Sequence, residues 1–182
     1  MKTFLSILRG INVSGHKKIP MAELKFLYEE LNFENVTTYI QSGNVIFKNK
    51  NSKNLSKQIE HKIFEKYNFN VPVIIRTPEE MRSIVEGNPF LKQKDIDLSK
   101  FYVVYLAEDP KQDCIDKLKK INYEPDKFYI SGKEVYLYCP NGYGNTKLTN
   151  NFFENKLDIT ATTRNWNTTN ELMKILKSYS PN

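Results

Sequence analysis

The sequence predicts an α+β protein built from two ferredoxin-like (β-α-β-β-α-β) modules, each with an added C-terminal helix. Apolar runs of strand length and amphipathic stretches of helix length follow one another in this order twice within 182 residues. Landmarks recur about half a chain apart, Tyr39 with Tyr129 and Arg76 with Arg164. The repeat is one of element order more than of residue identity, and it indicates a structural duplication.

Periodicity and end signals justify the elements of the first half. The apolar run at 4–8 stops at Arg9-Gly10, which is typical of a buried strand. Pro20 suits a first helical position, and Thr77 with Glu80 forms a capping box at another helix start. Gly43 lies in a short turn typical of a hairpin. The expected elements are strands at 4–8, 36–40, 44–47 and 71–75, and helices at 20–31, 55–67 and 77–86.

The same signals continue in the second half, after a stretch at 88–99 that lacks periodicity. A capping box from Thr168 to Glu171 predicts the start of the last helix. In the helix before it, Leu148 and Phe152 are expected to face the core. The expected elements are strands at 101–106, 127–130, 134–138 and 159–163, and helices at 113–121, 146–157 and from 168 onward. The module boundaries follow as 1–90 and 100–182, with a linker at 91–99.

The amino-acid composition limits the classes of protein and of partner that are possible. Hydrophobic residues are 40% and charged residues 26%, which is typical of a folded globular chain. The formal charge of +6 permits an anionic partner, although an excess of solvated lysines explains it equally well. No membrane-spanning run or secretory signal is present, and Cys114 and Cys139 lack metal-type spacing. We therefore expect a cytoplasmic protein with free thiols, no metal, no cofactor and no membrane partner. The sequence leaves the oligomeric state open.

Topology places the polar loops. In a ferredoxin-like module the first strand lies antiparallel to the third, so the loop after strand one lies beside the turn between strands two and three. The loop at 9–18 should therefore neighbour the turn at 41–44. In the second half the polar loops at 140–147 and 163–168 should converge. A cleft between the halves would join the two groups of loops.

Five stretches resemble a bacterial family catalogued as a domain of unknown function: LRGINVSG, PMAEL, TYIQSGNVIF, TKL and TRNWNT. Its hallmarks are an LRGINVGG-like start and a TYIQSGNV hairpin, and the resemblance spans nearly the whole chain. The resemblance implies two ferredoxin-like modules. It does not point to any particular activity. Ser14 stands where the family usually has glycine, and Thr146 where serine is usual. The matching positions are Arg9, Gly10, Asn12, Gly15, Tyr39, Gln41, Ser42, Gly43, Asn44, Lys147, Arg164, Asn165, Trp166 and Thr168.

The loop chemistry favours an anion such as phosphate. Gly10 and Gly15 allow backbone N–H groups to face a ligand, Arg9, Lys17 and Lys18 add positive charge, and a helix start follows. Each feature also has a purely structural explanation: glycines turn the chain, Ser and Asn occur in hairpin turns, and a tryptophan covers the core. Thr146 would cap a helix in the same way. The candidate ligand-binding residues are Arg9, Gly10, Asn12, Gly15, Lys17, Gln41, Ser42, Asn44, Lys147, Arg164, Asn165 and Trp166.

Three hypotheses for function remain. The first is a binding protein for a phosphate-bearing ligand, either a nucleotide or a nucleic acid, in a polar cleft. Tyr136 and Tyr138 would stack bases in its nucleic-acid version. The second is an enzyme acting on a small phosphorylated or carboxylated metabolite, with His16 or Lys147 transferring a proton, although no catalytic motif is present. The third is a scaffold that recognises a protein.

Overall fold

The computed structural model describes residues 1–93 and 96–179. It divides into two compact units, of which the first comprises Met1–Arg82 with the end of the last helix from Leu172, and the second comprises Ser83–Glu171. Each unit holds a four-stranded antiparallel sheet. The predicted α+β class with two duplicated ferredoxin-like modules is confirmed. The predicted linker at 91–99 includes residues 94 and 95, which lie outside the described residues.

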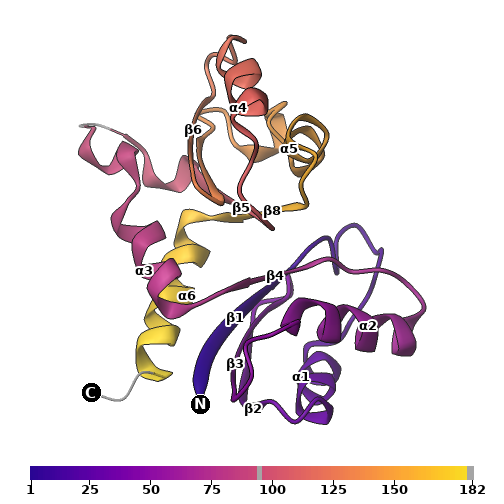
Figure 1. Cartoon of the computed structure of the whole chain (residues 1–182). Coiled ribbons are helices and arrows are strands. Elements are labelled where there is room, and N and C mark those ends of the chain that lie inside the picture. Colours follow the sequence, from indigo (N-terminus) through magenta and orange to yellow (C-terminus); the bar gives the residue numbers. More distant parts are fainter. Residues whose placement is uncertain (94–95, 180–182) are drawn as a thin grey trace. The chain divides into compact units, whose positions relative to one another are not determined.

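The sheet of the first unit has the strand order β2-β3-β1-β4, as a ferredoxin-like module requires. Two helices, α1 and α2, lie on one face of this sheet (Figure 1). A third helix, α3, follows the last strand. The bounds are β1 (Lys2–Leu8), α1 (Met21–Glu30), β2 (Glu34–Tyr39), β3 (Asn44–Asn49), α2 (Leu55–Tyr67), β4 (Val73–Arg76) and α3 (Pro78–Glu86).

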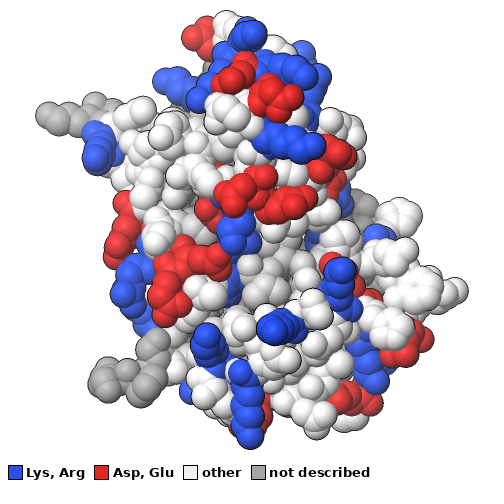
Figure 2. All heavy atoms as spheres, in the orientation of Figure 1, with Lys and Arg blue, Asp and Glu red and all other residues white. Residues whose placement is uncertain are grey.

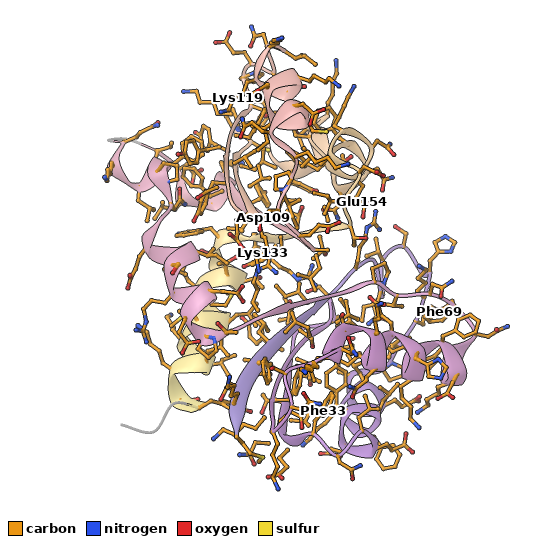
Figure 3. The ribbon with its side chains drawn as sticks, in the orientation of Figure 1. Phe33, Phe69, Asp109, Lys119, Lys133 and Glu154 are labelled. Atoms are coloured by element: carbon orange, nitrogen blue, oxygen red, sulfur yellow. The ribbon has the colours of Figure 1, made fainter. Side chains whose placement is uncertain are left out.

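The core of the first unit lies between this sheet and its two helices. Alternate residues of β1, Phe4 and Leu8, face α1 and α2, because successive side chains of a strand point to opposite faces. Phe33 stacks on Phe47 at 4.5 Å between ring centroids and lies in this layer (Figure 3). The Tyr28 hydroxyl is fully buried and shares a 2.7 Å hydrogen bond with the Ser6 hydroxyl. The one polar pair in this layer is therefore satisfied among the described residues.

The second unit repeats the arrangement with the strand order β6-β7-β5-β8. Helices α4 and α5 lie together on one face of the sheet (Figure 1). Two short 3-10 turns, at Pro89–Lys92 and Leu98–Lys100, precede the first strand of this sheet. Another lies at Tyr143–Asn145. The bounds are β5 (Phe101–Leu106), α4 (Gln112–Lys119), β6 (Lys127–Ser131), β7 (Glu134–Tyr138), α5 (Asn150–Leu157), β8 (Ala161–Asn165) and α6 (Trp166–Tyr179).

The duplication extends to individual side chains. Arg76 and Arg164 are both buried in the last strand of their sheet, and each donates from Nη1 at 2.9 Å to the carbonyl of the preceding residue. Glu60 of α2 accepts from the N–H of Val73 at the start of β4, and Glu154 of α5 accepts from the N–H of Ala161 at the start of β8. Four residues thus occupy matching places in two sheets.

The predicted capping box at α3 is confirmed. The N–H of Thr77 donates to Glu80 Oε2 at 2.8 Å, and the N–H of Glu80 donates to Thr77 Oγ1 at 3.2 Å. The capping box predicted for the last helix is wrong, because α6 already begins at Trp166. Asn165 provides its cap, accepting from the N–H of Thr168 at 2.7 Å. An asparagine side chain three residues before the helical N–H competes with the threonine for this role.

The helix predicted at 146–157 begins later, at Asn150, after Thr149 as its cap. Because Leu148 precedes the helix, its four-residue spacing to Phe152 does not define a helical face. The buried pair on α5 is instead Phe153 and Leu157, which are themselves four residues apart. Phe152 is half-buried and packs against Phe153 edge to face.

Candidate functional site

The loop after β1 folds against the turn between β2 and β3, as the topology predicts. The N–H of Leu8 donates to the carbonyl of Gly43 at 2.8 Å. Asn12 Nδ2 donates to the carbonyl of Gln41 at 2.9 Å. The first contact joins the end of β1 to the 41–44 turn, and the second joins the 9–18 loop to the same turn, so the first pair of polar loops lies together.

Asn12 holds this loop together from inside. Its Nδ2 also donates to the carbonyl of Ile19 at 3.0 Å, and its Oδ1 accepts from the N–H of Ile19 at 2.8 Å. Both amide hydrogens and the side-chain carbonyl are therefore used within the loop. Asn12 positions the loop backbone, and its side chain is not available as the main ligand contact.

The loop backbone is unusually rich in left-handed conformations. The residues with positive φ are Gly10 (69°), Asn12 (55°), Ser14 (49°), Gly15 (79°) and Lys17 (45°). Ser14, at a position where glycine is usual in the family that the sequence resembles, adopts this conformation despite its Cβ. Non-glycine residues in this region store strain, and they cluster where backbone groups are positioned for function.

A pocket of about 400 Å³ opens where this loop meets the start of α1. Pro20 occupies the cap position of α1, and no side chain among the described residues caps the helix there. The first N–H groups of α1 therefore lack intrahelical partners, and Pro20, which directly precedes them, lines the pocket. The pocket is lined by Asn12, Gly15, Lys18, Ile19, Pro20 and Gln41.

The loop beside this pocket carries positive charge. The sequence from Arg9 to Ala22 contains Arg9, Lys17 and Lys18 and no acidic residue. Lys17 Nζ donates to the carbonyl of Asn70 at 2.6 Å, which fixes its position, and Lys18 is exposed on the pocket wall.

The nearest acid along the chain, Glu23, is directed toward α2. Tyr67 donates to its Oε2 at 2.8 Å, and Lys66 lies 3.3 Å from the same oxygen. The hydrogen bond from Tyr67, and then that from Lys66, lower the pKa of Glu23. Its charge is thus matched by Lys66, which reduces its repulsion of an anion at the start of α1.

The remaining candidates of the turn serve the hairpin itself. Asn44 is fully buried, and its Nδ2 donates to the carbonyl of Tyr39 at 3.0 Å and to Ser42 Oγ at 3.1 Å. Gln41 is exposed at the rim of the pocket, and Gly10 is exposed in the loop. Of the turn residues, the Gln41 side chain has the most open access to a ligand.

The candidates of the second unit are mostly structural. Arg164 is 7% exposed and donates from Nη1 to Thr162 Oγ1 at 3.0 Å. Burial lowers the pKa of Arg164 to about 10, so the guanidinium stays protonated at neutral pH. Trp166 is buried at the start of α6, Asn165 caps that helix, and Lys147 is exposed. Lys147 is the one candidate here that presents an open charge.

We expect that Asn165→Ala lowers the free energy of unfolding by about 1 kcal/mol, because α6 loses its cap. Asn165→Asp should stay within about half of that loss, because a carboxylate accepts the same hydrogen bond and suits a helix start. Urea unfolding followed by circular dichroism measures both. Equal losses in the two variants would contradict the capping role.

The polar loops of the second unit converge as predicted. The Tyr143 hydroxyl donates to Thr163 Oγ1 at 3.2 Å. The Thr146 hydroxyl, at the position where serine is usual, donates to Asp126 Oδ2 at 2.6 Å and accepts from the N–H of Leu148. Its role is in the loop and not in helix capping. Nearby, Cys114 and Cys139 are free, and burial raises the pKa of the Cys139 thiol to about 11.

The geometry contradicts base stacking by Tyr136. This side chain is 3% exposed, and its hydroxyl donates to the carbonyl of Ile84 at 3.0 Å. Tyr138 packs against Phe101 at 4.9 Å between ring centroids. The alternation of β7 predicted a shared face correctly, but the face is covered.

Sequence reasoning missed two features of the first unit. Lys18 was expected to add positive charge but was not among the candidate ligand-binding residues, and it lines the pocket. A larger pocket of about 680 Å³ lies at the start of β1, and its walls include Lys2, Lys48 and Tyr179. No motif marks it, because its residues come from distant parts of the chain.

Two kinds of feature are absent from the part of the chain that the structure describes. None of the described helices combines the length and the apolar composition that crossing a membrane requires. The described residues contain no group of three or more His, Cys, Asp or Glu side chains arranged to hold a metal ion.

Fold and site together define an α+β protein of two ferredoxin-like modules with a basic, pocket-forming loop after its first strand. The chain belongs to the family described as "Protein of unknown function (DUF1697)", which matches residues 1–136. A search of curated proteins finds none that matches. Among solved structures, the chain is similar to "The structure of conserved bacterial protein SP0830 from Streptococcus pneumoniae". The two are 23% identical with a TM-score of 0.77, over 97% of this chain and 99% of that one, which shows the shared fold.

Proposed function

We propose that the protein binds a phosphate-bearing ligand, such as a nucleotide, at the pocket between the 9–18 loop and the start of α1. The observation that carries this proposal is the uncapped start of α1 beside a pocket that Lys18 lines. Backbone N–H groups at a helix start and in left-handed loop segments form concave sites that favour anions. The strain at Ser14 and Lys17 supports a loop conformation kept for binding.

The size and surroundings of the pocket favour a small ligand over a long nucleic acid. About 400 Å³ lies within the range of small-molecule sites. On the face shown in Figure 2, basic and acidic side chains are interspersed within each of the two units. A nucleotide or a sugar phosphate fits these features better than a duplex.

The free thiols indicate the kind of cellular compartment in which the protein would bind such a ligand. Cys114 and Cys139 form no disulfide, and burial raises the pKa of Cys139, so this thiol is mostly protonated at neutral pH. Free, unreactive thiols suit a reducing compartment, which supports a cytoplasmic location.

Thermal-shift and calorimetric titrations test the proposal with inorganic phosphate, nucleoside mono-, di- and triphosphates, sugar phosphates and short RNA and DNA. A ligand at a hundredfold excess over its Kd should stabilise the native state by about 2.7 kcal/mol. Lys18→Gln should weaken binding roughly tenfold, because a charge-assisted contact of about 1.4 kcal/mol is lost.

Lys25→Gln is the matched control, since Lys25 lies on α1 outside the pocket and pairs with Glu29 at 3.8 Å. It should bind as the unmodified protein does. Failure of every compound to bind, or equal weakening in both variants, would remove the proposal. Steep salt dependence of binding to RNA or DNA would instead favour a nucleic acid.

A further inference from the structure

The strand β6 is an edge of the second sheet, and the backbone N–H and C=O groups of two of its five residues point away from that sheet. The N–H of Leu106 donates to the carbonyl of Lys133, and the N–H of Cys139 donates to the carbonyl of Lys100. The backbone N–H and C=O groups of the odd-numbered residues of β7 therefore point toward β5. Those of the even-numbered residues point toward β6.

Three residues of β6 pair with these even-numbered residues of β7. Lys127 pairs with Tyr138, Tyr129 with Tyr136, and Ser131 with Glu134. The N–H and C=O groups of the two intervening residues, Phe128 and Ile130, must point to the open edge. Among the described residues, no strand pairs with β6 on that side.

The corresponding edge of the first unit is protected, and β6 is not. The register of β2 shifts between Glu34 and Thr37, and Asn35 has a positive φ of 52°. The Tyr179 hydroxyl donates to the carbonyl of Asn35 at 2.8 Å and also contacts the Thr37 hydroxyl. A bulge and a bound carbonyl are devices that block strand addition. The register of β6 runs without a shift over its whole length.

A groove of about 310 Å³ runs along the open edge of β6. Ile121 lies in it and is 48% exposed, and Tyr129 is 53% exposed. Lys119, at the end of α4 (Figure 3), is one of its charged residues. Its charges balance, because Lys119 and Lys127 are matched by Glu124 and Asp126. The whole protein has a formal charge of +6, but this groove has no net charge. Two copies of the chain therefore do not repel each other at the groove.

We propose that β6 pairs with β6 of a second copy of this chain, antiparallel and about a two-fold axis at Tyr129. In this register, Phe128 lies opposite Ile130 of the partner subunit, and Ile130 opposite Phe128 of the partner subunit. Both are hydrogen-bonded pairs, so all outward N–H and C=O groups of these residues find partners. The two sheets become one continuous sheet with an isologous interface.

The side chains suit the same register. Tyr129 lies opposite Tyr129 of the partner subunit in a non-hydrogen-bonded pair, where side chains approach most closely and aromatic pairs stabilise. Lys127 lies opposite Ser131 of the partner subunit, so no like charges face each other. Shifting the register by two residues would leave outward backbone groups unpaired. The strand is thus complementary to itself more than to an arbitrary peptide.

Ile130→Pro tests this interface without removing a hydrogen bond between β6 and β7. Proline removes the outward N–H of residue 130 and leaves the Lys127, Tyr129 and Ser131 ladder to β7 intact. Ile130→Val, which keeps the N–H, is the matched control. Sedimentation equilibrium over roughly 10 μM to 1 mM should show a monomer–dimer equilibrium for the unmodified protein and for Ile130→Val. Ile130→Pro should raise the dimer dissociation constant at least about tenfold.

Amide hydrogen exchange of the unmodified protein gives a test that needs no variant. The amides of Phe128 and Ile130 should exchange fast in dilute solution and slowly in concentrated solution, while the Tyr129 amide stays protected in both. A protein that remains monomeric up to about 1 mM overturns the proposal. Dimerisation unaffected by Ile130→Pro, or concentration-independent exchange at residues 128 and 130, overturns it as well.

Discussion

Gly43→Ala should lower the free energy of unfolding by about 3 kcal/mol, the largest effect that we expect from a single methyl group in this protein. A Cβ at Gly43 would lie 2.6 Å from Ile11 Cδ1 and 2.9 Å from Leu8 Cβ. Leu8 Cβ is bonded directly to the backbone of β1, so it cannot move away unless the strand moves with it. The φ of +77° adds strain for any residue with a side chain. Urea unfolding followed by circular dichroism measures the loss.

Gly15→Ala is the matched control for this substitution. Gly15 has a similar φ of +79°, but a Cβ there would meet nothing within 4 Å. Its loss should be about 1 kcal/mol, from backbone strain alone. The difference between the two variants isolates the close approach of the turn to the 9–18 loop. Equal losses would mean that the turn and the loop do not pack as described.

Asn12→Ala should lower the free energy of unfolding by about 3 kcal/mol, because three side-chain hydrogen bonds disappear together. The buried Ile19 loses partners for both its N–H and its carbonyl, and Gln41 loses a donor to its carbonyl. Residue 12 must also keep a φ of 55°, which alanine disfavours. Unfolding curves give the stability, and phosphate titration of the folded variant gives the effect on binding.

Asn12→Gly separates the two causes, since glycine adopts this φ freely and makes no side-chain bonds. It should recover about 1 kcal/mol relative to alanine. Both variants should bind the phosphate-bearing ligand at least roughly tenfold more weakly than the unmodified protein, because the loop loses its internal support. Unchanged affinity with lowered stability would show that Asn12 supports the fold and not the pocket.

Local signals determined much of this protein. The capping box of Thr77 and Glu80 needs only four consecutive residues, and it forms as expected. The order of strands and helices follows from apolar periodicity, which reports which face of each element is buried. Once the order is known, antiparallel pairing requires the 9–18 loop to meet the 41–44 turn. The fold class and the position of the pocket-forming loop are therefore readable from the sequence.

The chemical role of each loop residue was decided by tertiary structure. Asn12, Asn44 and Arg164 have side chains that suit a ligand, yet their hydrogen-bond partners in the structure are protein atoms. A sequence states which groups can donate and accept, but not whether a neighbouring carbonyl reaches them first. The start of α5 differed for the same reason, since Thr146 bonds to Asp126 and leaves the cap to Thr149.

The sequence by itself determined two ferredoxin-like modules and the loop that carries the candidate site, because amphipathic periodicity and turn signals depend on residues close in the chain. Only the tertiary structure decided which polar side chains face a pocket and which support the backbone. That choice depends on hydrogen-bond partners brought together from distant segments, as when Asn12 reaches both Ile19 and Gln41. Buried polar groups take the partners that folding supplies, because an unpaired one costs about 1–3 kcal/mol.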